Sequence, residues 1–408
     1  MSEATHTTVQ SFLAAHPAAH GILRSYGLEK FESPEVTASL GSVLTLQSAL
    51  SLAGSDAARF LEDVRRNEGR PAGERFAETY ANQRLLRMLG LLPCGMKMPF
   101  KRKFEEFVAK LPSSDIGLRC LVEGNVNHEL SYYPYIDTLE SADELPDVIV
   151  SADINSFFHW RFVDRFIASG VFEALPMDAS NPDFAGTGYA DPSHAYTMLS
   201  ANLLVLVVNT RKAAGYRVPR RWSELLDAAY AKSITMRGAD DFFCNGVLLP
   251  FYQAYGMDGV RRMAENVRAG RHPAEMVKEI EANAPEASPF YIMPLFFAQR
   301  LKDPRHFEIV VPEEGAIVSP VFLLVKKARR DEARVLADFI MGRELGQFCA
   351  ETGFPSVRSD VSNRLPPGCR LFWMGWDFLR REDPLEMKRK ISTVFAERFR
   401  REGGATCG

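Results

Sequence analysis

Residues 219–234 read P-R-R-W-S-E-L-L-D-A-A-Y-A-K-S-I and follow a strongly apolar run. That run, Leu203–Val208, predicts a buried strand, and the segment that carries Trp222 predicts a helix. Ile234–Met236, where the stretch ends, predicts a further short strand. Strand, helix and strand in this order indicate a βαβ unit.

The same alternation precedes this stretch. Leu86–Leu92 and Leu118–Val122 predict buried strands, and Pro99 between them opens a predicted helix. Asp147–Ser151 predicts a third strand, followed by a helix that carries Phe157. Parallel strands joined by helices give an α/β fold.

The alternation also continues downstream. A helix is predicted over Phe242–Tyr255, and two strands are predicted at Glu308–Val311 and Ala316–Val325. Ala333–Ile340 and Leu345–Ala350 are typical of helices that cover a sheet.

The N-terminal part differs, because residues 1–66 carry helical patterns only. Gly27 ends one of these predicted helices. Residues 67–84 are polar and predict a linker, so the chain divides into a small all-α module, a linker and an α/β body.

Composition excludes several classes of function. The net charge is −3, with 49 basic and 52 acidic residues, which argues against nucleic-acid binding. No apolar run is long enough to span a membrane. Residues 1–10 do not resemble a secretory signal, and the six cysteines are widely spread. We therefore expect a cytoplasmic protein with free thiols.

Residues 219–234 resemble the pattern P-x-x-W-x-D-L-L-D-x-x-Y-x-G-x-I of solute-binding proteins from ABC transporters of the ferric-iron type. Residues 315–321 and 354–358 resemble segments of the same family in the expected order. The resemblance implies a two-lobed fold, the type 2 periplasmic-binding-protein fold. It assigns residues 85–208 and 312–408 to the first lobe, the latter including C-terminal helices, and residues 209–311 to the second.

The segment H-P-A-A-H-G-I-L-R-S-Y-G-L near the N-terminus resembles a small helical domain attached to hybrid-cluster-type proteins. Its relatives often carry cysteines after the Tyr-Gly step, but residues 28–40 contain none here. The module is therefore expected to bind a protein partner or a second copy of the chain.

In a two-lobed α/β fold, ligands contact loops at the carboxyl ends of strands and the helix N-termini that face the cleft. The first lobe then contributes three candidate loops, with the residues Cys94, Gly95, Met96 and Lys97, then Asn125, Asn127 and His128, then Ser151, Asp153 and Asn155. The second lobe contributes Arg237, Asp241, Asn245, Tyr291 and Met293, and Tyr189 is a further candidate.

The chemistry of these residues favours an anionic ligand. The Cys94-Gly95 step allows close approach of the backbone, and Lys97 and Arg237 supply positive charge. In the stretch that follows Phe290, we expect Tyr291 and Met293 near the ligand and Phe296 and Phe297 in the core.

Metal binding is not expected. Ferric binders of the family bring tyrosines from the second lobe, whereas this chain offers Tyr189 and Tyr291 only singly. His128 with Glu123 or Asp153 is the alternative set of metal ligands. The sequence identifies no cofactor.

The predicted function is a cytoplasmic solute-binding protein that captures a small anionic molecule between its lobes. A sensor, in which lobe closure moves the N-terminal helices against a partner, uses the same binding site. The alternative is an enzyme on the same fold, in which Cys94 and His128 form a reactive thiolate pair.

Overall fold

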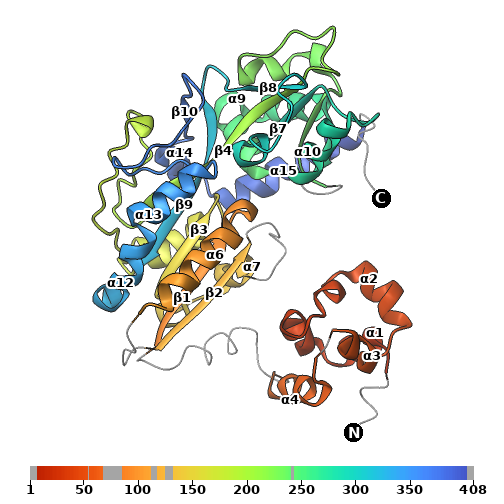
Figure 1. Ribbon diagram of the computed structural model, residues 1–408, viewed down its shortest axis with the longest axis vertical. Coiled ribbons are helices and arrows are strands. Elements are labelled where there is room, and N and C mark those ends of the chain that lie inside the picture. Colours follow the sequence, from red (N-terminus) through yellow and green to blue (C-terminus); the bar gives the residue numbers. More distant parts are fainter. Residues whose placement is uncertain are drawn as a thin grey trace. The chain divides into compact units, whose positions relative to one another are not determined.

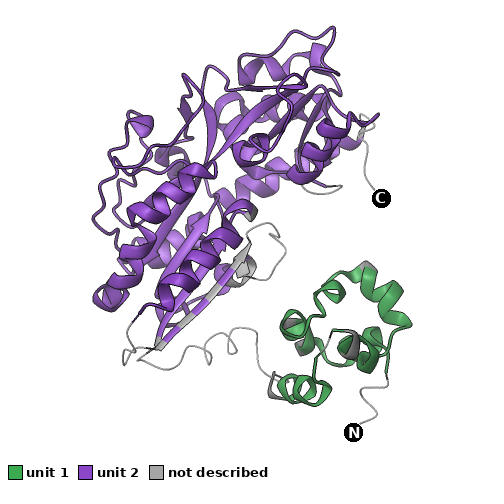
Figure 2. Cartoon of the chain, in the orientation of Figure 1, with its two compact units in different colours: residues 1–83 green, residues 84–408 purple. Residues whose placement is uncertain are grey.

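The computed structural model describes residues 7–53, 55–67, 85–111, 117–124, 132–239 and 243–401. The chain forms two compact units, residues 1–83 and residues 84–408, which Figure 2 shows in different colours.

The N-terminal unit is helical, as the sequence predicts. Its α-helices are α1 (Val9–Ala15), α2 (Pro34–Ser39), α3 (Leu46–Leu52) and α4 (Ala57–Asn67), with 3-10 turns at Pro17–Tyr26, Glu29–Glu32 and Leu40–Ser42. Phe12, Leu23 and Phe60 lie in one buried cluster. Gly27 ends its helix with a φ of 68°, which confirms the predicted stop.

The second unit contains one mixed sheet, which has ten strands in the part of the chain that the structure describes (Figure 1). The strands are β1 (Leu85–Leu92), β2 (Gly117–Gly124), β3 (Val148–Ala152), β4 (Thr197–Asn209), β5 (Ile234–Arg237), β6 (Val267–Arg271), β7 (Phe290–Pro294), β8 (Phe307–Val310), β9 (Ala316–Val325) and β10 (Leu371–Phe372). Their order is β2-β1-β3-β9-β4-β7-β5-β6, with β10 beside β9 and β8 beside β4.

Helices pack against this sheet both on the side of β1 and on the side of β5. The α-helices are α6 (Cys94–Val108), α7 (Tyr132–Thr138), α8 (Trp160–Phe162), α9 (Asn245–Asn266), α10 (Pro273–Ala282), α11 (Leu295–Ala298), α12 (Arg330–Ile340), α13 (Arg343–Glu351), α14 (Trp376–Arg381) and α15 (Pro384–Arg401). Shorter 3-10 and π turns lie at Ala142–Glu144, Ser156–Phe158, Val163–Ile167, Pro182–Phe184, Trp222–Leu226, Ala228–Tyr230 and Lys327–Arg329.

The sheet divides into two lobes. Lobe 1 holds β1, β2 and β3, and its core is formed with side chains of α6, α12 and α13. Lobe 2 holds β5, β6 and β7 with α9 and α10. This arrangement confirms the predicted two-lobed α/β fold.

Of the described strands, only β4 and β9 belong to the sheet of both lobes. Val321–Val325 of β9 pairs with β3, whereas Leu204–Val208 of β4 pairs with β7. Between these regions Ala201 pairs with Pro320, Asn202 with Ser319 and Leu203 with Val318, and no third described strand lies beside these three pairs. We call residues 201–203 and 318–320 the neck.

A proline is tolerated in the neck because of its register. Ala201 N–H donates to Pro355 O, and Pro320 O accepts from Asp153 N–H, so both groups of this pair point away from the partner strand. The missing N–H of Pro320 therefore removes no hydrogen bond between β4 and β9.

Three sequence expectations were wrong in detail. Helix α6 begins at Cys94 rather than Pro99, because the N–H groups of Met96 and Lys97 already bond to Pro93 O and Pro99 forfeits only one later bond. The Trp222 segment forms only a 3-10 turn, since Asp227 caps a new turn directly after it.

The third difference concerns α9. Gly256 breaks the helical conformation with a φ of 65°, as expected, but the helix resumes and continues to Asn266.

Strands β6 and β7 were not predicted as strands at all. Both are short and lie among residues whose pattern also suits a core helix or a loop.

The C-terminal helix α15 touches both lobes. It packs along α9, where Arg398 pairs with Glu265 and the ring of Phe395 lies 4.6 Å from that of Phe243. Near its other end, Lys388 Nζ lies 3.4 Å from Nε2 of His159 in lobe 1. Burial lowers the pKa of Lys388 to about 8.

A buried ion cluster joins β1, β3 and β9. Asp147 accepts from Arg87 Nε at 3.2 Å and from Lys326 Nζ at 3.2 Å, and all three residues are buried. Burial alone would raise the pKa of Asp147, but the hydrogen bonds and charges of Arg87 and Lys326 hold it below its usual value. One carboxylate therefore compensates two buried cations.

Replacing Asp147 with Asn should lower the free energy of unfolding by about 3–5 kcal/mol, because two buried cations lose their counter-charge. Urea unfolding at neutral pH measures the loss. Asp338→Asn is the matched control, since Asp338 pairs with Arg334 on the exposed surface and its loss should cost less than about 1 kcal/mol. Equal losses in the two variants would contradict the assignment.

Candidate functional site

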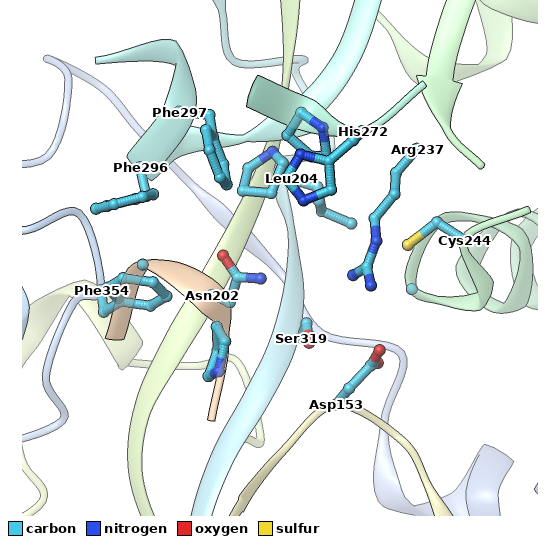
Figure 3. A pocket seen from close by; sticks show the side chains of 15 residues that line it. Asp153, Asn202, Leu204, Arg237, Cys244, His272, Phe296, Phe297, Ser319 and Phe354 are labelled. Carbon is cyan, nitrogen blue, oxygen red and sulfur yellow. The ribbon is translucent and has the colours of Figure 1, made fainter. Parts of the chain in front are cut away.

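A pocket lies where the two lobes meet at the neck (Figure 3). Its empty space measures about 590 Å³, including the part that opens to solvent. Its lining residues are Pro93, Gly95, Asp153, Asn202, Leu204, Arg237, Cys244, Gly246, His272, Pro273, Pro294, Phe296, Phe297, Ser319 and Phe354. They come from lobe 1, from lobe 2 and from the crossing strands β4 and β9.

Lobe 1 contributes an acid, Asp153, which directly follows β3. Its φ is 75°, a left-handed conformation that costs a non-glycine residue on the order of 1 kcal/mol. Two hydrogen bonds hold it there: its N–H donates to Pro320 O, and its Oδ1 accepts from Ile154 N–H, both at 2.8 Å. The carboxylate is thereby fixed at the edge of the pocket.

Lobe 2 contributes a positively charged residue, Arg237, which is the last residue of β5. Its carbonyl accepts from Cys244 N–H at 2.9 Å, so the chain returns to the strand end before α9 begins. Figure 3 shows the guanidinium of Arg237 and the carboxylate of Asp153 pointing toward each other across the pocket. Opposite charges from the two lobes therefore face each other.

Two further titratable groups line the lobe 2 side. Burial raises the pKa of the Cys244 thiol, which keeps it protonated at neutral pH. Burial and the nearby charge of Arg237 lower the pKa of His272. His272 Nδ1 also accepts from Ala274 N–H at 3.2 Å, so the neutral ring carries its proton on Nε2. At neutral pH, Arg237 is thus the charged group among these three.

The neck contributes Asn202 and Ser319, which are cross-strand partners. Asn202 Oδ1 is buried and has no hydrogen-bond partner within the described residues. An unpaired buried acceptor is costly, so this atom favours a ligand or water that brings a donor.

Aromatic rings form the opposite end of the pocket. The ring of Phe296 lies 5.0 Å from that of Phe297 and 5.6 Å from that of Phe354. A Cβ atom at Gly95 would lie 2.5 Å from the Phe296 ring. Phe296 of lobe 2 therefore packs directly against the first turn of α6 in lobe 1, and only a glycine leaves room for it.

Three of the predicted site residues line the pocket: Gly95, Asp153 and Arg237. Five others cannot be placed, because Asn125, Asn127, His128 and Asp241 and the side chain of Cys94 lie outside the described residues. Whether any of them binds a ligand stays a prediction.

The remaining predicted residues do not line the pocket. Met96 belongs to the lobe 1 core, and Lys97 lies in α6 outside the lining. Asn155 Nδ2 donates to the oxygens of Ser151, Tyr133 and Ala152, which makes it part of a buried network. Asn245 lies in the first turn of α9 and accepts from Ser392.

The expectation for the aromatic stretch was wrong for three of its four residues. Tyr291 and Met293 are fully buried in β7, and Tyr291 donates to Glu279, whereas Phe297 is partly exposed and lines the pocket. Phe296 is buried in the lobe 1 core, as expected, and its ring also lines the pocket. Tyr189 is buried as well, and its hydroxyl donates to Ser200 O at 2.6 Å. Strand β7 lies between β4 and β5, so its side chains fill the core, and the chain reaches the pocket only after Pro294.

Sequence reasoning missed Asn202, His272, Ser319 and Phe354. One signal was present, because Asn202 interrupts an otherwise apolar strand. No three His, Cys, Asp or Glu side chains within the described residues could together hold a metal ion. No helix among those residues is long and apolar enough to cross a membrane.

Known structures share the fold of the second unit. An extracellular solute-binding protein from Bordetella parapertussis matches with a TM-score of 0.54 and 14% identity, covering 78% of this chain and 99% of that one. The Trichodesmium protein FutA, solved with iron and citrate, gives 0.53 and 12%, covering 79% and 100%. AfuA from Actinobacillus pleuropneumoniae, solved with fructose-6-phosphate, gives 0.52 and 16%, covering 78% and 99%.

None of the curated proteins compared with this chain matches it. A family model, described as bacterial extracellular solute-binding protein, matches residues 143–382, which is more than half of the chain. This match extends from just before β3 to the end of α14 and includes both crossings of the neck. The chain therefore belongs to the bacterial extracellular solute-binding protein family.

Proposed function

We propose that this protein captures a small anionic molecule in the pocket between its lobes. The observation that carries the proposal is the position of Arg237, whose guanidinium points into a pocket lined by both lobes. A guanidinium in a partly enclosed site binds carboxylate or phosphate groups strongly. Two of the similar structures were solved with citrate and with a sugar phosphate, which also carry such groups.

Binding is expected to favour the closed arrangement of the lobes. A molecule between Asp153 of lobe 1 and Arg237 of lobe 2 contacts both lobes at once, so its binding energy favours their approach. The neck contains only two strands and can twist more readily than the wider sheet on either side.

A cytoplasmic location and a sensor role complete the proposal. The described cysteines Cys120, Cys244, Cys349 and Cys369 are free thiols, which suits a reducing compartment. On the N-terminal unit, Val43 is 76% exposed and Leu40 is 40% exposed, which suits docking of a protein partner or a second copy. Cell fractionation tests the location. Sedimentation of the protein with and without Val43→Asp tests self-association, and a monomer in both cases would count against it.

The central test is capture of metabolites from a cell extract by the purified protein, followed by mass spectrometry. We expect a compound that bears a carboxylate, phosphate or other anionic group to be retained, and Arg237→Gln to weaken its binding by about 1.5–3 kcal/mol, roughly 10- to 150-fold. Arg305→Gln is the control, because Arg305 pairs with Asp303 on the surface of the protein. Retention that does not depend on Arg237 would remove this residue from the site.

The same experiment distinguishes a binder from an enzyme. A solute-binding protein releases the captured compound unchanged. Turnover of that compound, abolished by Cys94→Ser, would instead indicate catalysis and contradict the proposed function.

Gly95→Ala tests the contact that closes the aromatic end of the pocket. The new Cβ would lie 2.5 Å from the Phe296 ring, so the lobes should fail to approach fully and affinity for the captured compound should fall about tenfold or more. Alanine favours the helix more than glycine by about 1 kcal/mol, so the variant should stay folded.

The second variant is Gly95→Ala combined with Phe296→Leu, which relieves the clash. Calorimetric titration should show that the double variant binds better than Gly95→Ala alone. Additive losses in the double variant would show that Gly95 and Phe296 do not act through this contact.

A further inference from the structure

The pocket has two chemically different ends. Arg237, Asp153 and Cys244 lie at one end, Phe296, Phe297 and Phe354 lie at the other, and Asn202 and Ser319 lie between them (Figure 3). A ligand that fills this space must therefore be polar at one end and apolar at the other.

The polar end presents both signs of charge. An anion beside Arg237 also faces the carboxylate of Asp153, and the resulting repulsion opposes binding of a ligand that carries negative charge alone. A ligand with an anionic and a cationic group pairs with both residues. Its contacts with Arg237 and Asp153 then replace the attraction between these two side chains.

Lys388 does not remove this demand for a cation. Its ammonium, on α15, interacts electrostatically with Asp153, Asp137 and Asp383. One ammonium shared among three carboxylates leaves the lobe 1 side of the pocket in need of positive charge.

The middle of the pocket also requires a donor. Asn202 Oδ1 is a buried acceptor without a partner among the described residues, and the carboxylate of Asp153 lines the same pocket. An ammonium group has three N–H donors and no acceptor, so it suits both atoms. A second carboxylate or a phosphate oxygen on the ligand would suit neither.

The apolar end suits a hydrocarbon body. Phe297 is partly exposed in the pocket, and Pro273 and Pro294 line the same region. Arg300 covers one face of Phe296 at 4.2 Å and Phe354 is buried, so the ring that remains for a ligand is that of Phe297.

We propose that the ligand is a zwitterion with an apolar body, of the α-amino acid class. Its carboxylate binds Arg237, its ammonium donates to Asp153 and Asn202, and its side chain lies against Phe297. The inference rests on the proposed function and names the substrate class of the same site.

The experiment compares matched pairs of compounds on the full chain by calorimetric titration. Each pair consists of an amino acid and the same molecule without its amine: L-phenylalanine with 3-phenylpropionate, and L-leucine with 4-methylpentanoate. We expect each amino acid to bind at least tenfold more tightly than its partner, and phenethylamine, which lacks the carboxylate, to bind more weakly than L-phenylalanine.

Asp153→Asn is the decisive variant, because asparagine tolerates the positive φ at this position and keeps the size of the side chain. It should reduce the tenfold preference to within about twofold. Asp137→Asn is the matched control, since Asp137 also interacts with Lys388 but does not line the pocket, and it should leave the preference unchanged.

Two outcomes overturn the inference and leave the proposed function standing. One is equal binding within each pair, and the other is Arg237-dependent capture from the extract of an anion that lacks a cationic group, with no binding of the amino acids. A preference that survives Asp153→Asn also overturns it, because the ammonium would then bind elsewhere. Capture that does not depend on Arg237 contradicts the proposed function instead.

Discussion

The antiparallel pairing of β4 with β9 is the interaction on which the second unit depends. The two strands carry the backbone hydrogen bonds of both lobes, so neither lobe has a complete sheet without them. Because the pairing runs without interruption from Ser200 to Leu204, the chain crosses between the lobes as part of a hydrogen-bonded ladder. The pocket lies at the narrowest part of this pairing, where Asn202 and Ser319 are neighbours.

Strand direction explains why opposite charges meet there. Asp153 follows the carboxyl end of β3 and Arg237 forms the carboxyl end of β5, and both ends face the neck. The hydrogen bond from Asp153 N–H to Pro320 O joins the acid to β9 itself. The position of each charge within its lobe is therefore fixed by the end of a short strand, whereas the distance between the two charges depends on the neck.

Sequence patterns identified the fold because strands such as Leu85–Leu92 and Ala316–Val325 are nearly continuous apolar runs. The same reasoning found Asp153 and Arg237, since both stand at the ends of such runs. It could not assign Tyr291 and Phe297 correctly, because both belong to one apolar stretch and only the position where β7 ends separates core from pocket.

Other parts of the site depend on contacts between distant segments. Phe354 reaches Phe296 from a loop that follows α13, and the need for glycine at position 95 arises only from a ring that lies 201 positions later in the chain. The role of Asn202 depends on its register with Ser319. None of these relations has a local signature in the sequence.

Helix α15 is attached unequally to the two lobes, so movement of the lobes changes its contacts. Its attachment to lobe 2 is extensive, with the Arg398–Glu265 ion pair and the rings of Phe395 and Phe399 on Phe243. Its hydrogen-bonding attachment through Lys388 to lobe 1 is a single 3.4 Å contact with His159. Rotation of the lobes would therefore change the contact of Lys388 with His159, where α15 meets lobe 1, more than the contacts of α15 along lobe 2.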